Sequence, residues 1–225
     1  MNISVILTGG IGKRMSQNLP KQFIKIYDVE VFIYTLNAFL NNDNIDRCVL
    51  VINSAFKEDY ESILKRHNLS DKVEICFGGL TRQESSFNAI RYLKENGGSD
   101  EDIVLIHDGA RPLIGDEIIN QNIALCKYGT AVSTIVSTFD TLVDKDYNLI
   151  DRNKVFSVQT PQTFTLKDAF NMHVSAISDG VVSASDDIQL AKRLSMNISF
   201  ANGSRKNIKM TTLEDIDIIK CFLRK

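Results

Sequence analysis

Short apolar runs alternate with amphipathic stretches along the chain, and each type has a length typical of one kind of element. The apolar runs are rich in β-branched residues and short enough to be buried strands. We expect strands at Ile3–Leu7, Arg47–Ile52, Val73–Phe77, Ile103–Ile106, Ala131–Val136 and Ile198–Ala201. The amphipathic stretches predict helices at Val31–Asn41, Glu58–His67, Gln83–Asn96, Asp116–Lys127, Thr165–Ala176, Asp186–Arg193 and Thr212–Arg224. This alternation predicts an α/β fold whose mainly parallel sheet is covered by helices.

The segment Ser137–Gln162 breaks the pattern. It consists of a strand, a polar turn around Asp144–Asn148, and a return through Leu149–Val158. We therefore expect a hairpin that projects from the parallel sheet, either as an arm for a partner subunit or as a lid.

Composition narrows the class of protein. The 225 residues fit one large domain, and 26 basic against 28 acidic residues give a net charge of -2. This balance does not suggest a nucleic-acid partner, so any anion must be bound by local clusters of cations and backbone N–H groups. The four cysteines (Cys48, Cys76, Cys126 and Cys221) show no metal-ligand spacing, and Cys48 and Cys76 lie in apolar runs. With neither a signal peptide nor a membrane span in the pattern, we expect a soluble, cytoplasmic protein without a membrane partner.

A glycine-rich loop follows the first predicted strand, and it begins Thr8-Gly9-Gly10-Ile11-Gly12-Lys13-Arg14-Met15. Glycines at this place let the backbone approach phosphate oxygens closely. A P-loop requires a glycine where Leu7 stands and a Ser or Thr where Arg14 stands, so that motif is absent.

Three other interpretations of the loop stay open. A dinucleotide fingerprint lacks its third glycine, and Pro20 would interrupt the crossover helix, although Asp28 and Glu30 lie at a suitable distance for a ribose-binding acid. In a nucleoside-triphosphate loop, glycines would wrap the phosphates while Arg14 and Lys21 neutralise them. The third interpretation is a plain turn with solvated Lys and Arg.

Eight blocks in order decide among these interpretations. The loop Gly10–Met15 with Pro20-Lys21-Gln22 resembles the opening motif of the methylerythritol-phosphate and ribitol-phosphate cytidylyltransferases. Further blocks similar to that family are Gly78–Ser85, His107–Pro112, Asp140-Thr141, Asp151–Asn153, Gln159–Gln162, Asp186-Asp187 and Asn207–Thr212. Each block alone is weak, but together they span about residues 3–220.

The resemblance implies a fold, an assembly and a reaction. The fold would be a single Rossmann-like domain over residues 1–225 with a β-arm at 137–160, and the enzyme would be a homodimer through that arm. The reaction would transfer CMP from CTP to a sugar-alcohol phosphate with Mg²⁺ and release pyrophosphate. An NAD-binding dehydrogenase is a distant alternative.

The resemblance also implies roles for individual residues. The catalytic residues would be Arg14, Lys21, Lys209 and Asp108, with Lys209 bridging the attacking phosphate and the α-phosphate. The nucleotide would be bound by Thr8, Gly9, Gly10, Gly12, Gly79, Arg82, Ser85 and Gly109. The acceptor would be bound by Arg111, Thr141, Arg152 and Thr160, some of them across a dimer.

The acceptor is either 2-C-methyl-D-erythritol 4-phosphate or ribitol 5-phosphate. The glycines of Thr8–Gly10 are closer to the ribitol-phosphate enzymes. The blocks Gly109–Arg111, Asp151–Asn153, Asp186-Asp187 and Asn207–Lys209 resemble the methylerythritol-phosphate enzymes, which we therefore favour. The arm between Thr141 and Arg152 is shorter than is usual in the family.

The chemistry suits a chain without a nucleophile motif. A phosphate monoester has a second pKa of about 6, so at neutral pH it is mostly a dianion and needs no general base. We expect catalysis by positioning and charge. Among the other polar residues, we expect His107 to be a buried, hydrogen-bonded imidazole, Asp186-Asp187 to cap a helix, and Lys127, His173 and Arg205 to be solvated. The family resemblance further implies that Asp186-Asp187 supports the acceptor site without taking part in the chemistry.

Overall fold

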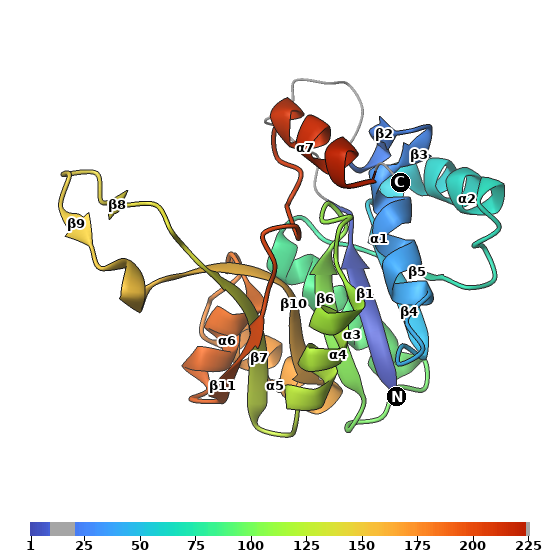
Figure 1. Cartoon of the computed structure of the whole chain (residues 1–225). Coiled ribbons are helices and arrows are strands. Elements are labelled where there is room, and N and C mark those ends of the chain that lie inside the picture. The colour runs from blue at the N-terminus through green and yellow to red at the C-terminus, as the bar shows by residue number, and fades with distance from the viewer. Residues whose placement is uncertain (10–20, 224–225) are drawn as a thin grey trace.

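The computed structural model describes residues 1–9 and 21–223, with the side chain of Lys21 excluded. Within these residues, seven strands form one sheet in the order β11-β7-β10-β6-β1-β4-β5 (Figure 1). The strands are β1 (Asn2–Leu7), β4 (Arg47–Ile52), β5 (Glu74–Phe77), β6 (Ile103–Asp108), β7 (Thr130–Ser137), β10 (Phe156–Thr165) and β11 (Asn197–Asn202). Only β10 is antiparallel to its neighbours β6 and β7, so the predicted mainly parallel sheet is confirmed.

Helices cover both faces of the sheet. On one face lie α1 (Val31–Leu40), α2 (Lys57–Arg66) and α4 (Asp116–Leu125), and on the other α3 (Arg82–Glu95), α5 (Leu166–Ser178) and α6 (Asp187–Arg193). Because successive side chains of a strand point to opposite faces of the sheet, each strand contributes to the apolar cores on both faces. In β1, for example, Val5 packs in the core with α3 and α5, whereas Ile6 packs in the core with α1 and α4.

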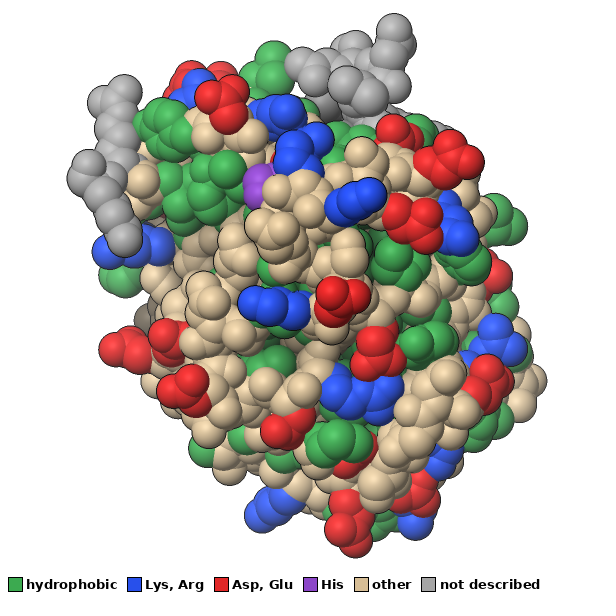
Figure 2. Space-filling model, turned by 90° about the vertical axis from the view of Figure 1, so that its right-hand side faces the viewer, with side chains coloured by type: hydrophobic (Ala, Val, Ile, Leu, Met, Phe, Trp, Pro, Cys, Tyr) green, Lys and Arg blue, Asp and Glu red, His purple; other side chains and the backbone are tan. Residues whose placement is uncertain are grey.

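Smaller elements complete the upper end of the molecule in Figure 1. Helix α7 (Leu213–Leu223) packs beside the short hairpin of β2 (Lys25–Ile26) and β3 (Val29–Glu30), with Ile219 and Ile26 in one apolar cluster. The short 3-10 helices are η1 (Lys21–Phe23), η2 (Ser54–Phe56) and η3 (Arg152–Lys154). No helix among the described residues is long and apolar enough to cross a bilayer. Acidic and basic side chains are mixed over the face shown in Figure 2.

Among the described residues, the sequence pattern predicted every α-helix and all but one strand of the central sheet. The exception is β10: the predicted arm includes residues 156–160, but residues 156–158 pair with β7 and the strand runs on into the core. Its polar sequence, FSVQTPQTFT, lacks the apolar pattern of a buried strand. Buried hydrogen bonds compensate: the Thr163 hydroxyl donates to Asn122 Oδ1 (3.0 Å), and the Thr134 hydroxyl donates to the carbonyl oxygen of Pro161 (2.6 Å).

The predicted projecting hairpin is present. Between β7 and β10 the chain leaves the body of the molecule and forms β8 (Leu142–Val143) and β9 (Leu149–Ile150), which pair antiparallel (Figure 1). The predicted polar turn closes it, because Asp144 Oδ1 accepts from the N–H groups of Asp146 and Asn148, both at 2.9 Å. The arm is thus a small hairpin on a longer stalk.

A buried histidine of β6 is hydrogen-bonded to β10 near the carboxyl end of the parallel strands. The His107 side chain is fully buried, with Nε2 lying 3.3 Å from the carbonyl oxygen of Arg111 and Nδ1 lying 3.0 Å from the Thr160 hydroxyl. Since a carbonyl oxygen can only accept, Nε2 carries the proton, and the Thr160 hydroxyl donates to Nδ1. The same hydroxyl accepts from the N–H of Asp108 at 3.1 Å. The predicted buried, hydrogen-bonded imidazole is confirmed.

The burial of His107 predicts an acid-sensitive stability. Burial lowers the pKa of His107 to about 4 from its ordinary value of 6.5, so between these values the unfolded chain binds a proton that the folded chain does not. The free energy of unfolding should therefore decrease as the pH falls through this window, by about 3 kcal/mol from this residue. His107→Gln, which keeps a donor and an acceptor, should flatten the dependence in urea unfolding at a series of pH values. Equal slopes for both proteins would contradict the assignment.

Candidate active site

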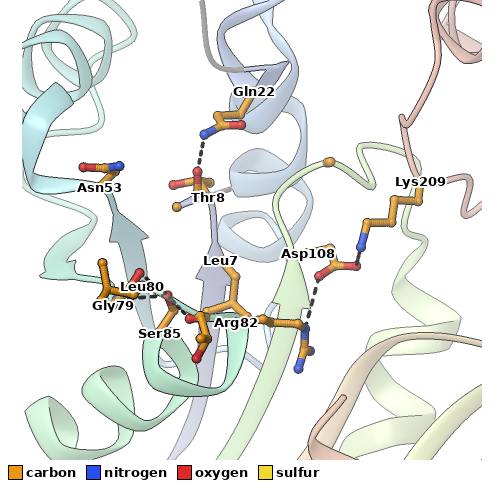
Figure 3. A pocket seen from close by; sticks show the side chains of 13 residues that line it. Leu7, Thr8, Gln22, Asn53, Gly79, Leu80, Arg82, Ser85, Asp108 and Lys209 are labelled. Carbon is orange, nitrogen blue, oxygen red and sulfur yellow. Dashed lines mark hydrogen bonds and ion pairs between the residues drawn. The ribbon is translucent and has the colours of Figure 1, made fainter. Parts of the chain in front are cut away.

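The carboxyl ends of four neighbouring parallel strands border a cavity of about 490 Å³ (Figure 3). Leu7 ends β1, Asn53 follows β4, Gly79 follows β5 and Asp108 ends β6. Ligands of open α/β sheets bind at this edge. The predicted site residues that line the cavity are Thr8, Gly9, Gly79, Arg82, Ser85, Asp108 and Lys209.

The backbone at Thr8 is held from both sides. Its N–H and its hydroxyl both donate to the carbonyl oxygen of Val51, at 2.9 and 2.7 Å. Its own carbonyl oxygen accepts from Gln22 Nε2 and from the Tyr60 hydroxyl, the latter at 3.2 Å. Burial raises the pKa of Tyr60 to about 12, so this hydroxyl stays a donor. The strand-to-loop turn is therefore fixed before any ligand binds, by two residues, Gln22 and Tyr60, to which the motif analysis gave no role.

A second turn is built at the start of α3. Thr81 caps the helix by accepting from the N–H of Glu84, while Glu84 Oε2 accepts from the N–H of Leu80 at 2.7 Å. A side chain at Gly79 would collide with that of Glu84, since a Cβ there would lie 2.2 Å from its Cγ. The Ser85 hydroxyl accepts from the N–H of Gly79 and donates to the carbonyl oxygen of Thr81. Gly79 and Ser85 thus shape the cavity wall.

The Asp108 carboxylate is the electrostatic centre of the cavity (Figure 3). Lys209 Nζ lies 2.7 Å from its Oδ2, Arg111 Nε lies 3.6 Å from the same oxygen, and Arg82 Nε lies 3.9 Å from Oδ1. Burial alone would raise the pKa of Asp108, but these three cations hold it well below its ordinary value. Asp108 therefore remains charged at neutral pH and orients the cations around it.

A second cavity, of about 340 Å³, adjoins the first through Lys209, which lines both. Its wall includes Arg111 and Arg205, and Arg111 Nη1 donates to the carbonyl oxygen of Asn207 at 2.8 Å. Burial lowers the pKa of Arg111. Lys209 thus stands where the contents of the two cavities would meet.

The remaining predicted acceptor residues are dispersed in the single chain. The Arg152 Nη1 atom donates to the carbonyl oxygen of Phe139 at 2.8 Å, and Thr141 is exposed at the root of the arm; neither lines the Asp108 cavity. Thr160 is buried beneath Asp108, and its hydrogen is donated to His107. Gly109, predicted to bind the nucleotide, does not line the Asp108 cavity either: its N–H donates to the carbonyl oxygen of Leu7, and it lies too close to Thr8 for a side chain.

Part of the predicted site lies outside the described residues. This applies to Gly10, Gly12 and Arg14 and to the side chain of Lys21. The backbone of Lys21 begins η1, and the next residue, Gln22, lines the same cavity as Lys209.

One expectation was wrong and a second is confirmed only in part, and both concern one buried cluster. His173 is fully buried rather than solvated, whereas Lys127 and Arg205 are exposed as expected. In the predicted helix cap, Asp186 does accept from the N–H of Gln189, but Asp187 is buried and pairs with Arg82. Because neighbouring residues at a helix start point in different directions, two adjacent acids were a signal that one of them faces the core.

Comparisons with known proteins agree with this geometry. The family model described as "IspD: 2-C-methyl-D-erythritol 4-phosphate cytidylyltransferase" matches residues 2–225. A 2-C-methyl-D-erythritol 4-phosphate cytidylyltransferase of Thermosipho africanus is 38% identical over 97% of this chain and 96% of its own length. A ribitol-5-phosphate cytidylyltransferase of Vibrio parahaemolyticus is 35% identical over 99% of this chain and 96% of its own.

The fold leads to the same family. The crystal structure of a 4-diphosphocytidyl-2C-methyl-D-erythritol synthase from Anaerococcus prevotii superimposes with a TM-score of 0.82 and 28% identity, covering 100% of this chain and 96% of that one. The dehydrogenase alternative is therefore wrong. The chain belongs to the IspD family and is a CTP-dependent cytidylyltransferase.

Proposed function

We propose that this enzyme transfers CMP from CTP to 2-C-methyl-D-erythritol 4-phosphate and releases pyrophosphate. The supporting observation is the position of Lys209, which lines two adjoining cavities and is paired with Asp108 between them. CTP occupies the cavity at the strand ends, and the acceptor occupies the cavity beside Arg111. We further propose that the enzyme acts in the cytoplasm.

The reaction joins two anions, so the main task of the site is to neutralise charge and align the groups. The acceptor phosphate, as a dianion, attacks the α-phosphorus of CTP, and the bond from that phosphorus to the β-phosphate oxygen breaks. Lys209 contacts both the attacking group and the α-phosphate, while Arg82, and Arg14 and Lys21 from the first loop, bind the triphosphate. Such preorganised charges act mainly on the transition state.

A divalent cation suits this site only as a partner of the triphosphate. Among the described residues no group of three or more His, Cys, Asp or Glu side chains could hold a metal, and Asp108 is the cavity's single carboxylate there. Mg²⁺ prefers to keep water and phosphate oxygens as ligands with one or two carboxylates. We therefore propose that Mg²⁺ binds with CTP and that Asp108 is its protein contact, where it supplies further charge neutralisation.

Ribitol 5-phosphate is the second candidate acceptor, since relatives named for either acceptor have similar identity to this chain. Gly9 and Gly10 of the first loop also favour it. The two acceptors differ in a methyl branch and in the number of hydroxylated carbons. Pyrophosphate release with CTP and Mg²⁺ should be at least tenfold faster, in kcat/KM, with the methylerythritol phosphate. A preference for ribitol phosphate would replace our assignment, and no release with either would refute both.

Removal of the Lys209 charge should slow the reaction itself. We expect Lys209→Ala to lower kcat by roughly 10²–10³-fold, the scale of losing one preorganised charge-stabilising donor. Lys206→Ala is a matched control, because Lys206 is exposed on the same loop and does not line either cavity. Steady-state kinetics in which both variants lose the same activity would contradict the role of Lys209.

The arm supports a homodimer. It exposes a run of apolar side chains that its two short strands are too small to cover, including Phe139, Val143, Tyr147, Leu149 and Ile150. A second copy of the chain would cover them. We propose that the arm packs on the partner and places Thr141 and Arg152 at the partner's acceptor cavity. Within their own chain, neither residue lines the cavity that contains Lys209 and Arg111.

Disruption of the arm should abolish dimerisation and leave nucleotide binding unchanged. Tyr147 is 83% exposed at the tip of the arm, and Tyr128 is 67% exposed on the body, so Tyr147→Glu and Tyr128→Glu are matched variants. We expect Tyr147→Glu to give a monomer in analytical ultracentrifugation, with a KM for the acceptor raised at least tenfold and unchanged CTP affinity. A dimer that persists in Tyr147→Glu, or dissociates equally in both variants, would argue against the arm.

A further inference from the structure

Arg82 lies between two carboxylates, only one of which belongs to the cavity. Its Nη1 atom is 2.7 Å from Asp187 Oδ2, whereas its Nε atom is 3.9 Å from Asp108 Oδ1. Arg82 lines the nucleotide cavity, but the Asp187 side chain is 1% exposed and does not line it. Of the described side chains that Asp187 contacts, Arg82 is the one that lines this cavity, so Asp187 would act on a ligand through Arg82.

Asp187 is itself held firmly. Its backbone N–H donates to Gln162 Oε1 at 2.8 Å, and the Ser86 hydroxyl lies 3.5 Å from its Oδ2. Its other oxygen lies 3.4 Å from Nε2 of the buried His173, whose ring stacks on Phe87. Burial raises the pKa of Asp187, but Arg82 and His173 outweigh it and bring that pKa to about 2. The carboxylate is thus a fixed charge at neutral pH.

Stability alone does not account for this arrangement. Asp187 is buried and Arg82 largely so, and the desolvation energy of such an ion pair can exceed its attraction, so that an apolar pair of similar volume often serves the fold equally well. The pair does have a consequence for the cavity. Without Asp187, the nearest carboxylate for Arg82 is Asp108, where Arg82 would compete with Lys209.

We propose that Asp187 is a positioning residue that holds the Arg82 guanidinium at the wall of the nucleotide cavity and keeps it from pairing closely with Asp108. Arg82 is then free to contact the phosphates of CTP, and Asp108 remains available to orient Lys209. This proposal rests on the proposed role of Arg82 toward bound CTP.

The test is a double-mutant cycle between Asp187→Asn and Arg82→Ala, with Asp179→Asn as the matched control. Asp179 also pairs with an arginine, Arg193, but the pair is exposed and lines neither cavity. We expect Asp187→Asn to lower kcat/KM for CTP by roughly 10–10²-fold, as for a misplaced binding group, with the KM of the acceptor unchanged. In the Arg82→Ala background the same change should have no further effect, and Asp179→Asn should stay within about twofold of the wild type.

The possible outcomes are distinguishable. Additive losses in the cycle, or equal changes in the KM of CTP and of the acceptor, would show a general structural role and overturn the proposal. Wild-type kinetics for Arg82→Ala would remove its premise, whereas an inactive wild-type enzyme would refute the proposed function instead. Should Asp187→Asn not fold by circular dichroism, Asp187→Glu keeps the charge but displaces it; a raised KM for CTP is then expected, and wild-type kinetics would overturn the proposal.

Discussion

One carboxylate, Asp108, organises the charges of this enzyme. Three cations from separate segments surround it: Arg82 from α3, Arg111 from the loop after β6, and Lys209 from the loop after β11. Without a counter-charge these cations would repel one another. Asp108 supplies one negative charge, and Asp187, which pairs with Arg82, supplies a second. Three positive and two negative groups leave a net charge of only +1, so a bound triphosphate also requires the proposed cations Arg14, Lys21 and Mg²⁺ for its neutralisation.

The polar strand β10 makes this cluster rigid. Asp108 ends β6, and its backbone N–H is fixed by Thr160 of β10, which is fixed in turn by the neutral His107. Gln162 of the same strand accepts from the N–H of Asp187. The backbones of Asp108 and Asp187 are therefore both hydrogen-bonded to buried side chains of one strand, which fixes where the two carboxylates lie relative to each other.

The sequence predicted what depends on periodicity, and it failed where polar residues are buried. Apolar runs located the other six strands of the central sheet because their side chains face an apolar core, but β10 is buried through its hydrogen bonds and has no such pattern. The motif blocks identified Asp108, Arg82 and Lys209 as site residues. That Arg82 and Lys209 both lie beside the Asp108 carboxylate follows only from the fold. His173 was misplaced because a lone histidine on an amphipathic helix gives no indication of which acid a distant segment brings beside it.

The two halves of the site are built differently, and this bears on their specificity. The proposed nucleotide half lies on the ends of β1, β4, β5 and β6, with its turns already hydrogen-bonded. The proposed acceptor half combines the buried Arg111 with the exposed stalk residues Phe139 and Asp140. Exposed connecting segments vary more easily than buried elements. We therefore expect acceptor choice to diverge at the stalk while the charges around Asp108 stay in place, in agreement with the similar identities of relatives named for two different sugar-alcohol phosphates.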